Sequence, residues 1–261
     1  NARLSKKNEK YIDELYKKLH RQGYLRRDCQ KLINQDRNVF AAAMVSSNDA
    51  EAMVTGITRP FGRCFEDITK VICHIKNENF LSMSMLVSKE RTVFIGDVNI
   101  HENPNEFQLA DIACGIARTV KSFGYDPKVA LLSFSNFGNP SGIKSEIIKN
   151  SVHLLSERNV DFEFDGEMSA ETALDFNLIK ENYPFCRLSG PANVLIMPDL
   201  SSANISFQLL QKLGGGNVLG PIMIGGEQSF QIVQMGASVT EIIDAATIAT
   251  YNAIQKNKII T

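Results

Sequence analysis

The chain has 261 residues, 44% of them hydrophobic and 22% charged, with a formal net charge of -1. This length allows one large domain or two ordinary ones, and the composition is average for a globular protein. The small net charge argues against the broad basic surface of a nucleic-acid-binding protein, and the longest apolar runs are far too short to span a membrane.

The first part of the chain predicts helices that are followed by short strands. Apolar residues at helical spacing predict a helix in the charged opening stretch, which ends at Gly23, and then a second, short helix. Two short apolar runs predict buried strands, a helix follows, and two more strands enclose a charged turn. The predicted helices are 6–23, 27–33 and 64–75, and the predicted strands are 38–47, 50–60, 82–87 and 92–98.

From residue 101 onward, helices alternate with short apolar strands. The first of these helices carries a capping box, with Asn105 as N-cap and Gln108 three residues later. The last helix carries the same arrangement in Ser238 and Glu241. The predicted helices are 101–124, 145–158, 169–182, 201–213 and 238–257, and the predicted strands are 127–135, 161–168, 193–200 and 217–225. This alternation predicts α/β layers around a largely parallel sheet.

The order of the elements predicts two lobes. A hairpin-like pair of strands precedes the long helix at 101–124, so we place a boundary near residue 104. The first lobe is predicted to combine 1–104 with 219–261, and the second to span 105–218. Because ligands of open α/β sheets bind at the carboxyl ends of strands, the loops that follow strands are the first candidates for a site.

One such loop, SFSNFGNPSG, follows the strand at 127–135 and offers hydroxyls, an amide, an aromatic ring and glycines. It either presents backbone N–H groups to a phosphate or carbonyl oxygen, or is an ordinary polar loop with a packed Phe137. Asp199 is predicted to cap the next helix but one. Gly214 to Gly216 are predicted as a C-terminal helix cap, whereas Gly220 lies within a strand and permits a close approach by a ligand.

The cysteines and histidines argue against structural disulfides and a zinc site. The five cysteines are an odd number without C-x-x-C spacing, and the four histidines do not cluster with them. This cysteine usage fits a reducing compartment, so a cytoplasmic location is expected. The chain opens on Asn1 in a charged helical pattern, which suggests a piece of a longer protein.

Five motifs stand in the order found in phosphate acetyltransferases: VALLSFSNFG, FDGEMSAETAL, GPANVLIMPDLSSANISFQLLQKLGG, VLGPIMIGG and GASVTEI. The chain resembles this family from about residue 24 to 255, most specifically over 129–225. It is most similar to the phosphotransacetylase-like C-terminal domain of hybrid bacterial malic enzymes. The resemblance implies an α/β fold of two lobes, with mainly parallel sheets, helices on both faces and a cleft between the lobes.

Active members of this family move an acetyl group between coenzyme A and phosphate, and their last loop carries a Ser-Arg-Gly step followed by an acidic residue. The aligned step here is Gln234-Met235-Gly236, and the aligned acid is Glu241. Glutamine has no hydroxyl group and methionine no charge, so a fixed cation that would stabilise the phosphate is missing. The stretch that holds Arg59 is shorter than in active members, so this arginine is not matched to theirs. The resemblance therefore implies no catalytic residues.

The resemblance also implies a cleft that still binds acetyl-CoA. A cation such as Arg187 or Lys212 suits the phosphates of the coenzyme. The alternatives are a structural ion pair for Arg187 and a solvated surface position for Lys212. No metal ligand is expected in this chain. The expected acetyl-CoA-binding residues are Ser133, Ser135, Asn136, Phe137, Gly138, Arg187, Lys212, Gly220, Pro221 and Ile222.

We therefore expect a non-catalytic allosteric domain of a malic enzyme. A missing N-terminal malic enzyme domain of the same chain would decarboxylate malate to pyruvate with NADP and a divalent metal, and acetyl-CoA would inhibit it. One alternative is an active phosphate acetyltransferase with altered residues, and another is an oligomerisation domain with an empty cleft. A homodimer or higher homo-oligomer is expected, with Ile242, Ile243 and Ala246 of the last helix either in its interface or in the core.

Overall fold

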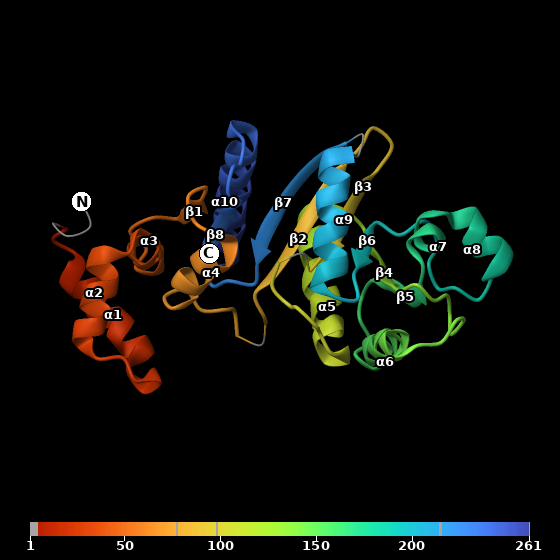
Figure 1. Cartoon of the computed structure of the whole chain (residues 1–261), viewed down its shortest axis with the longest axis horizontal. Helices are drawn as coiled ribbons and strands as arrows, with labels where there is room; N and C mark the ends of the chain where they lie inside the picture. The colour runs from red at the N-terminus through yellow and green to blue at the C-terminus, as the bar shows by residue number, and fades with distance from the viewer. Residues whose placement is uncertain (1–4, 77, 98, 214–215, 261) are drawn as a thin grey trace. The chain divides into compact units, whose positions relative to one another are not determined.

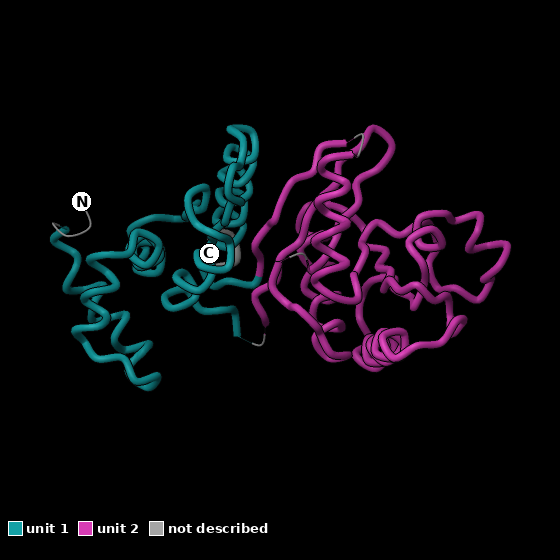
Figure 2. The backbone as a smooth tube through the Cα atoms, viewed as in Figure 1, with its two compact units in different colours: residues 1–77, 225–261 teal, residues 78–224 magenta. Residues whose placement is uncertain are grey.

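The computed structural model describes residues 5–76, 78–97, 99–213 and 216–260. The chain forms two compact units, which Figure 2 distinguishes by colour. Unit 1 comprises residues 1–77 and 225–261, and unit 2 comprises residues 78–224. Unit 1 is therefore built from both ends of the sequence, whereas unit 2 is one continuous segment.

Unit 1 packs helices around a two-stranded parallel sheet (Figure 1). Strands β1 and β8 lie side by side, with Gly56 opposite Val233 at their carboxyl ends. A Cβ atom on Gly56 would lie 2.0 Å from the Val233 carbonyl oxygen, so only glycine allows the two strands to approach in this way. The elements are α1 Asn8–Leu19, η2 His20–Gln22, α2 Arg26–Gln35, α3 Arg37–Ser46, β1 Ala52–Gly56, α4 Phe61–Thr69, β8 Ser229–Val233 and α10 Val239–Ile260.

Unit 2 is a six-stranded sheet in the order β5-β4-β6-β3-β2-β7, in which β2 runs antiparallel to β3 and β7 and the other neighbours are parallel. Helices cover both faces (Figure 1). Phe94 of β3 meets Phe123 at the end of α5, whereas the next residue, Ile95, packs against Phe207 of α9. The elements are β2 Leu81–Val87, β3 Thr92–Gly96, α5 Glu106–Ser122, β4 Lys128–Leu132, α6 Ile143–Glu157, β5 Glu163–Met168, α7 Ala170–Leu174, α8 Phe176–Asn182, β6 Val194–Ile196, α9 Leu200–Leu213 and β7 Asn217–Ile224.

The predicted α/β architecture with largely parallel sheets is confirmed, and both predicted capping boxes form. The Gln108 N–H donates to Asn105 Oδ1 over 2.9 Å, and the Asn105 N–H donates to Gln108 Oε1 over 3.0 Å. In α10 the Glu241 N–H donates to Ser238 Oγ over 3.3 Å, and the Ser238 N–H donates to Glu241 Oε2 over 2.6 Å. These bonds satisfy N–H groups that a first helical turn leaves without partners.

The predicted strand at 38–47 is wrong, because this segment forms helix α3. Asp36 caps the helix by accepting hydrogen bonds from the N–H groups of Asn38 over 2.8 Å and Val39 over 3.2 Å. The run holds three alanines, the residue with the highest helix propensity. A short buried apolar run does not distinguish a strand from a helix by its periodicity, which explains the error.

Three further predictions change in detail. The predicted helix at 169–182 is two helices, because Asp175 ends α7 and caps α8 through the N–H groups of Asn177 and Leu178. The predicted helix at 64–75 extends too far, because α4 ends at Thr69. Strand β8 was not predicted. The predicted cap at Gly214 to Gly216 includes residues 214–215, which lie outside the described residues.

The predicted lobe boundaries differ from those of the two units. The sequence interpretation assigned residues 78–104 to the first lobe, but β3 pairs with β6 and β2 pairs with β7. Backbone hydrogen bonds therefore place these two strands in the sheet of unit 2, together with residues 219–224 of β7. The boundaries lie at 77/78 and 224/225 instead of near 104 and 218.

Candidate functional site

The loop that follows β4 is held against the end of β5 by Glu167, whose side chain is only 2% exposed. Glu167 Oε1 accepts hydrogen bonds from Ser135 Oγ over 3.0 Å and from the Gly138 N–H over 2.6 Å. The Phe137 N–H donates to the Glu167 carbonyl oxygen over 2.8 Å. Three of the predicted site residues are thus fixed by one residue that the sequence interpretation did not single out.

The backbone N–H groups of this loop all find partners within unit 2, contrary to the expectation that they face a ligand. Besides the two N–H groups bound to Glu167, the Ser135 N–H donates to Ser133 Oγ over 3.2 Å. The N–H groups of Asn136 and Asn139 donate to each other's carbonyl oxygens over 3.0 and 3.2 Å. Without rearrangement, residues 135–139 therefore offer no free N–H group to a phosphate.

The side chains of the same loop are also engaged within unit 2. Asn136 Oδ1 accepts a hydrogen bond from the Ser169 N–H over 2.7 Å, which joins the loop to the start of α7. The Phe137 ring packs against Tyr183 and Phe185, with centroid distances of 5.1 and 4.9 Å. This is the packed Phe137 of the ordinary-loop alternative. The five predicted residues 133 and 135–138 do lie together at the carboxyl ends of β4 and β5.

Arg187 forms the structural ion pair that the sequence interpretation kept as its alternative. Its Nη2 lies 3.1 Å from Asp165 Oδ1, and its backbone N–H donates to Asp165 Oδ2 over 2.8 Å. Nη1 donates to Ser156 Oγ over 2.9 Å, and the guanidinium lies 4.5 Å from the centre of the Phe164 ring. The charge of Arg187 is thus balanced within unit 2.

The remaining predicted residues lie at the other end of the sheet. Lys212 is exposed in the last turn of α9, and Gly220, Pro221 and Ile222 belong to the edge strand β7. A Cβ atom on Gly220 would lie 3.0 Å from Ser84 Oγ, so the close approach that this glycine permits is to β2. Three strands separate β7 from the β4–β5 loops, so unit 2 does not bring the ten predicted residues together.

The step after β8 has the composition that raised the question of lost chemistry. Met235 is 62% exposed, Gln234 is half-buried, and Gly236 has a φ of 78°. Glu241 is used as the second half of the α10 capping box. An exposed, uncharged methionine offers no fixed charge to an anion at this position.

Two buried carboxylates lie at the carboxyl ends of β3 and β6. Asp97 accepts hydrogen bonds from the N–H groups of Ser82 over 2.9 Å and His101 over 3.1 Å, and its Oδ2 lies 2.7 Å from His101 Nδ1. Asp199 pairs with Lys144 and accepts a hydrogen bond from the Ser202 N–H over 2.8 Å, which confirms it as a helix cap. Both carboxylates are committed to protein donors.

Asp199 provides a pH-dependent contribution to stability. Burial alone would raise its pKa, but the hydrogen bonds from Lys144 and Ser202 outweigh burial and hold the pKa below its ordinary value. A carboxyl with a lowered folded-state pKa stabilises the fold above its unfolded pKa of about 4, and this stabilisation is lost as the pH falls through the lower folded value. We expect Asp199→Asn to be less stable than the original chain at pH 7, with a smaller difference at pH 3. Urea denaturation at the two pH values measures this, and an equal difference at both would contradict it.

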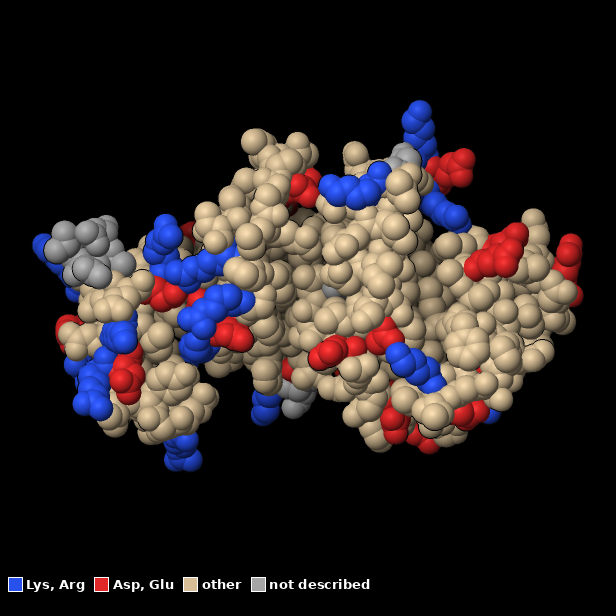
Figure 3. Space-filling view, in the orientation of Figure 1, with Lys and Arg blue, Asp and Glu red and all other residues tan. Residues whose placement is uncertain are grey.

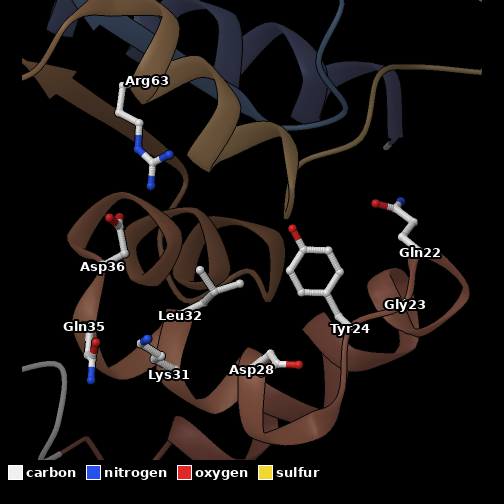
Figure 4. A pocket seen from close by; sticks show the side chains of 9 residues that line it. All are labelled: Gln22, Gly23, Tyr24, Asp28, Lys31, Leu32, Gln35, Asp36 and Arg63. Carbon is white, nitrogen blue, oxygen red and sulfur yellow. The ribbon is translucent and has the colours of Figure 1, made fainter.

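Unit 1 contains a cavity of about 620 Å³ that the sequence interpretation missed. Figure 4 shows Tyr24 from the turn before α2 and Arg63 from α4 on its walls. Cations and carboxylates alternate around it, so its charge does not select a ligand of either sign. The lining residues are Gln22, Gly23, Tyr24, Asp28, Lys31, Leu32, Gln35, Asp36 and Arg63.

A smaller cavity of about 270 Å³ lies at the carboxyl end of β1. Arg37 and Arg59 line it, and neither was assigned to a site from the sequence. The available signal was the position of Arg59 directly after a strand, which is where ligands of α/β proteins bind. The helix that presents Arg37 was predicted as a strand, so its proximity to Arg59 was not foreseen.

Comparison with known proteins identifies the family. The family model described as phosphate acetyl/butaryl transferase matches residues 1–250. The NADP-dependent malic enzyme of Rhizobium meliloti (strain 1021) is 48% identical over 253 residues, covering 97% of this chain and 33% of that protein. The phosphate acetyltransferase of Treponema pallidum (strain Nichols) is 32% identical over 220 residues, covering 80% of this chain and 66% of that protein. The chain thus spans about a third of the length of the malic enzyme relative.

Solved structures agree with this assignment. The crystal structure of a phosphotransacetylase from Streptococcus pyogenes matches with a TM-score of 0.91 and 25% sequence identity, covering 98% of this chain and 78% of that one. The two-unit architecture described above is therefore that of a phosphotransacetylase. Because the family model extends over nearly the whole sequence, the chain belongs to the phosphate acetyl/butaryl transferase family.

Proposed function

We propose that this chain is a regulatory, acetyl-CoA-binding domain of a malic enzyme and has no acetyltransferase activity. The observation that carries the proposal is the Gln234-Met235 step at the end of β8, where the family resemblance expects serine and arginine. The exposed Met235 side chain supplies neither a proton acceptor nor a charge. Transfer of an acetyl group to phosphate requires stabilisation of developing negative charge, so this substitution favours binding without transfer.

In the proposed parent protein, an N-terminal domain outside this chain oxidises and decarboxylates malate to pyruvate. The names of the malic enzyme relatives and the third of their length that this chain spans support this arrangement. NADP and a divalent metal would bind in that outer domain, and no residue of this chain is assigned to either. Acetyl-CoA would inhibit the parent by binding one of its conformations more tightly than another.

Among the residues assigned to acetyl-CoA, Lys212 fits a phosphate contact best. It is exposed and forms no ion pair with any residue in the described ranges, whereas the charge of Arg187 is balanced by Asp165. The 133–138 loop fits less well, because its N–H groups are already bonded. We therefore expect the loop to contribute shape and apolar contact through Phe137 more than hydrogen bonds.

Calorimetry on the 261-residue chain tests the binding proposal. We expect saturable heat with acetyl-CoA, and roughly tenfold weaker binding for Lys212→Ala, because a charge-assisted hydrogen bond contributes on the order of 1.5–3 kcal/mol. Lys149→Ala is the matched control, since Lys149 is an exposed lysine of α6 in the same unit. The absence of both heat and a thermal shift with acetyl-CoA would contradict the proposal.

An active acetyltransferase is the second candidate, favoured by the family membership and by the Treponema pallidum relative. An assay of acetyl-CoA formation from acetyl phosphate separates the two candidates. We expect no turnover. Turnover that disappears in Glu241→Gln, a change that preserves the capping bond to Ser238, would make the chain an enzyme.

The proposal includes self-association and a cytoplasmic location. Ile243 and Ala246 are exposed on α10 and Ile242 is half-buried, so the last helix presents apolar side chains that suit a homodimer or higher homo-oligomer. The five cysteines are unpaired. Among the described residues, no helix has both the length and the hydropathy that crossing a membrane requires. Sedimentation of a monomer at all concentrations would remove self-association from the proposal.

A further inference from the structure

The small cavity of unit 1 is lined by cations and polar groups from three elements. Its walls are the first turn of α3, strand β1 and the loop that leads to α4. At about 270 Å³ it has room for several waters, each of which occupies about 30 Å³ in the liquid. No carboxylate belongs to its described lining, which consists of Arg37, Asn38, Ala41, Met53, Val54, Thr55, Gly56, Thr58 and Arg59.

Arg59 is held in place from one side only. Its Nη1 donates to Asp36 Oδ2 over 2.6 Å and lies 3.2 Å from Asp67 Oδ2. Among the described residues, no acceptor meets its Nε or Nη2. A guanidinium that is anchored through one nitrogen keeps its other donors in a fixed planar fork, which matches the oxygens of a phosphate.

The two carboxylates behind Arg59 do not cancel the positive charge of the region. Asp67 is fully buried and also lies 3.3 Å from Arg63 Nη2 and 3.2 Å from Lys70 Nζ. Three cations therefore face two carboxylates even before Arg37 is counted. Figure 3 shows lysine and arginine side chains gathered on the visible face of unit 1.

Arg37 adds a second guanidinium to the cavity wall. It is the first residue of α3, it is exposed, and it forms no ion pair with any residue that the structure describes. A second cation on the same wall, free of internal partners, distinguishes this cavity from the larger one, where both signs of charge alternate. An anion that enters the cavity would meet both arginines.

Asn38 contributes a buried amide to the same wall. It is 6% exposed, and its Oδ1 accepts a hydrogen bond from Thr55 Oγ1 over 2.6 Å. Its Nδ2 has the Cys64 thiol as its neighbouring acceptor, which is a weak one, and meets no oxygen acceptor among the described residues. The adjoining Ile57 has a φ of 65°, a conformation that is unusual for a β-branched residue and recurs at binding sites.

We propose that this cavity binds a phosphate group through Arg37 and Arg59. Neither arginine is among the positions that the family resemblance assigned, and the proposal does not depend on acetyl-CoA binding. The same chemistry is offered by free inorganic phosphate and by the phosphates of a nucleotide coenzyme. The experiment below separates these two sources.

Titration of the 261-residue chain with inorganic phosphate, at an ionic strength held constant with sodium chloride, tests the proposal. We expect saturable binding that is weakened roughly tenfold by Arg37→Gln, because a charge-assisted hydrogen bond is lost from a site that stays folded. Arg27→Gln is the matched control, since it removes the same charge from an exposed position of α2 in the same unit. It is expected to leave phosphate binding unchanged.

A second arm adds adenosine 3′,5′-bisphosphate or acetyl-CoA to the phosphate-loaded chain. Displacement of phosphate by either identifies the cavity as a site for a coenzyme phosphate, and binding without displacement identifies a site for the free ion. Phosphate that behaves like chloride, or an Arg27→Gln protein that is weakened as much as Arg37→Gln, would overturn the proposal. If phosphate binds while acetyl-CoA does not, the proposed regulatory function fails and this inference stands.

Discussion

Gly56→Ala is expected to destabilise the chain by about 2–6 kcal/mol, the largest effect of any single change considered. Gly56 has a φ of 124°, where an alanine is strained by about 1–3 kcal/mol. The added Cβ would also lie 2.0 Å from the Val233 carbonyl oxygen, and overpacking of this kind costs about 1–3 kcal/mol more. Urea denaturation followed by circular dichroism measures the loss.

Gly62→Ala provides a control of opposite sign. Gly62 lies on the exposed side of α4 in the same unit, and a Cβ atom added there would meet no atom within 4 Å. Alanine in a helix is favoured over glycine by up to about 1 kcal/mol, so this variant should be slightly more stable than the original chain. If Gly56→Ala were as stable as Gly62→Ala, the close contact between β1 and β8 would be refuted.

Glu167→Ala is expected to lower the free energy of unfolding by about 2–4 kcal/mol, because it leaves two buried donors without an acceptor. These donors are Ser135 Oγ and the Gly138 N–H, both of which bind the same carboxylate oxygen. The loop after β4 should then become mobile, which hydrogen exchange at residues 135–139 would detect. Differential scanning calorimetry gives the matching shift in melting temperature.

Two variants separate the role of Glu167 from a general effect of losing a carboxylate. Glu167→Gln keeps one acceptor oxygen and should cost less than Glu167→Ala. Glu181→Ala removes an exposed glutamate of α8 in the same unit and should stay within about 0.5 kcal/mol of the original chain. Unchanged hydrogen exchange in Glu167→Ala would show that the loop is held by other contacts.

The elements that the sequence predicts well are those whose determinants are close together in the chain. Helices α5 and α10 begin where Asn105 and Ser238 predict, because a capping box is complete within four residues. Strand β8 was missed because its five residues become a strand through pairing with β1, which lies far away in the sequence. The error at α3 has the same origin, since burial on several sides removes the periodicity that would identify a helix.

The candidate site was harder to predict because strand order is not written in the sequence. Gly220 and the 133–138 loop both follow the logic of α/β sheets, yet β7 pairs with β2 and lies at the edge opposite β5. Glu167 was overlooked because its partners come from a different strand. Arg37 and Arg59 line one cavity only because α3 is a helix whose first turn meets the end of β1.

Strand β7 has a consequence for the behaviour of the protein at high concentration. It ends the sheet of unit 2, and an open strand edge is a place where another chain can add itself and begin an aggregate. Gly220 and Pro221 stand in the middle of this strand, the register against β2 shifts between Met83 and Met85, and proline has no N–H group to donate. The outer edge is therefore an interrupted template, which protects the sheet against fibre-like growth.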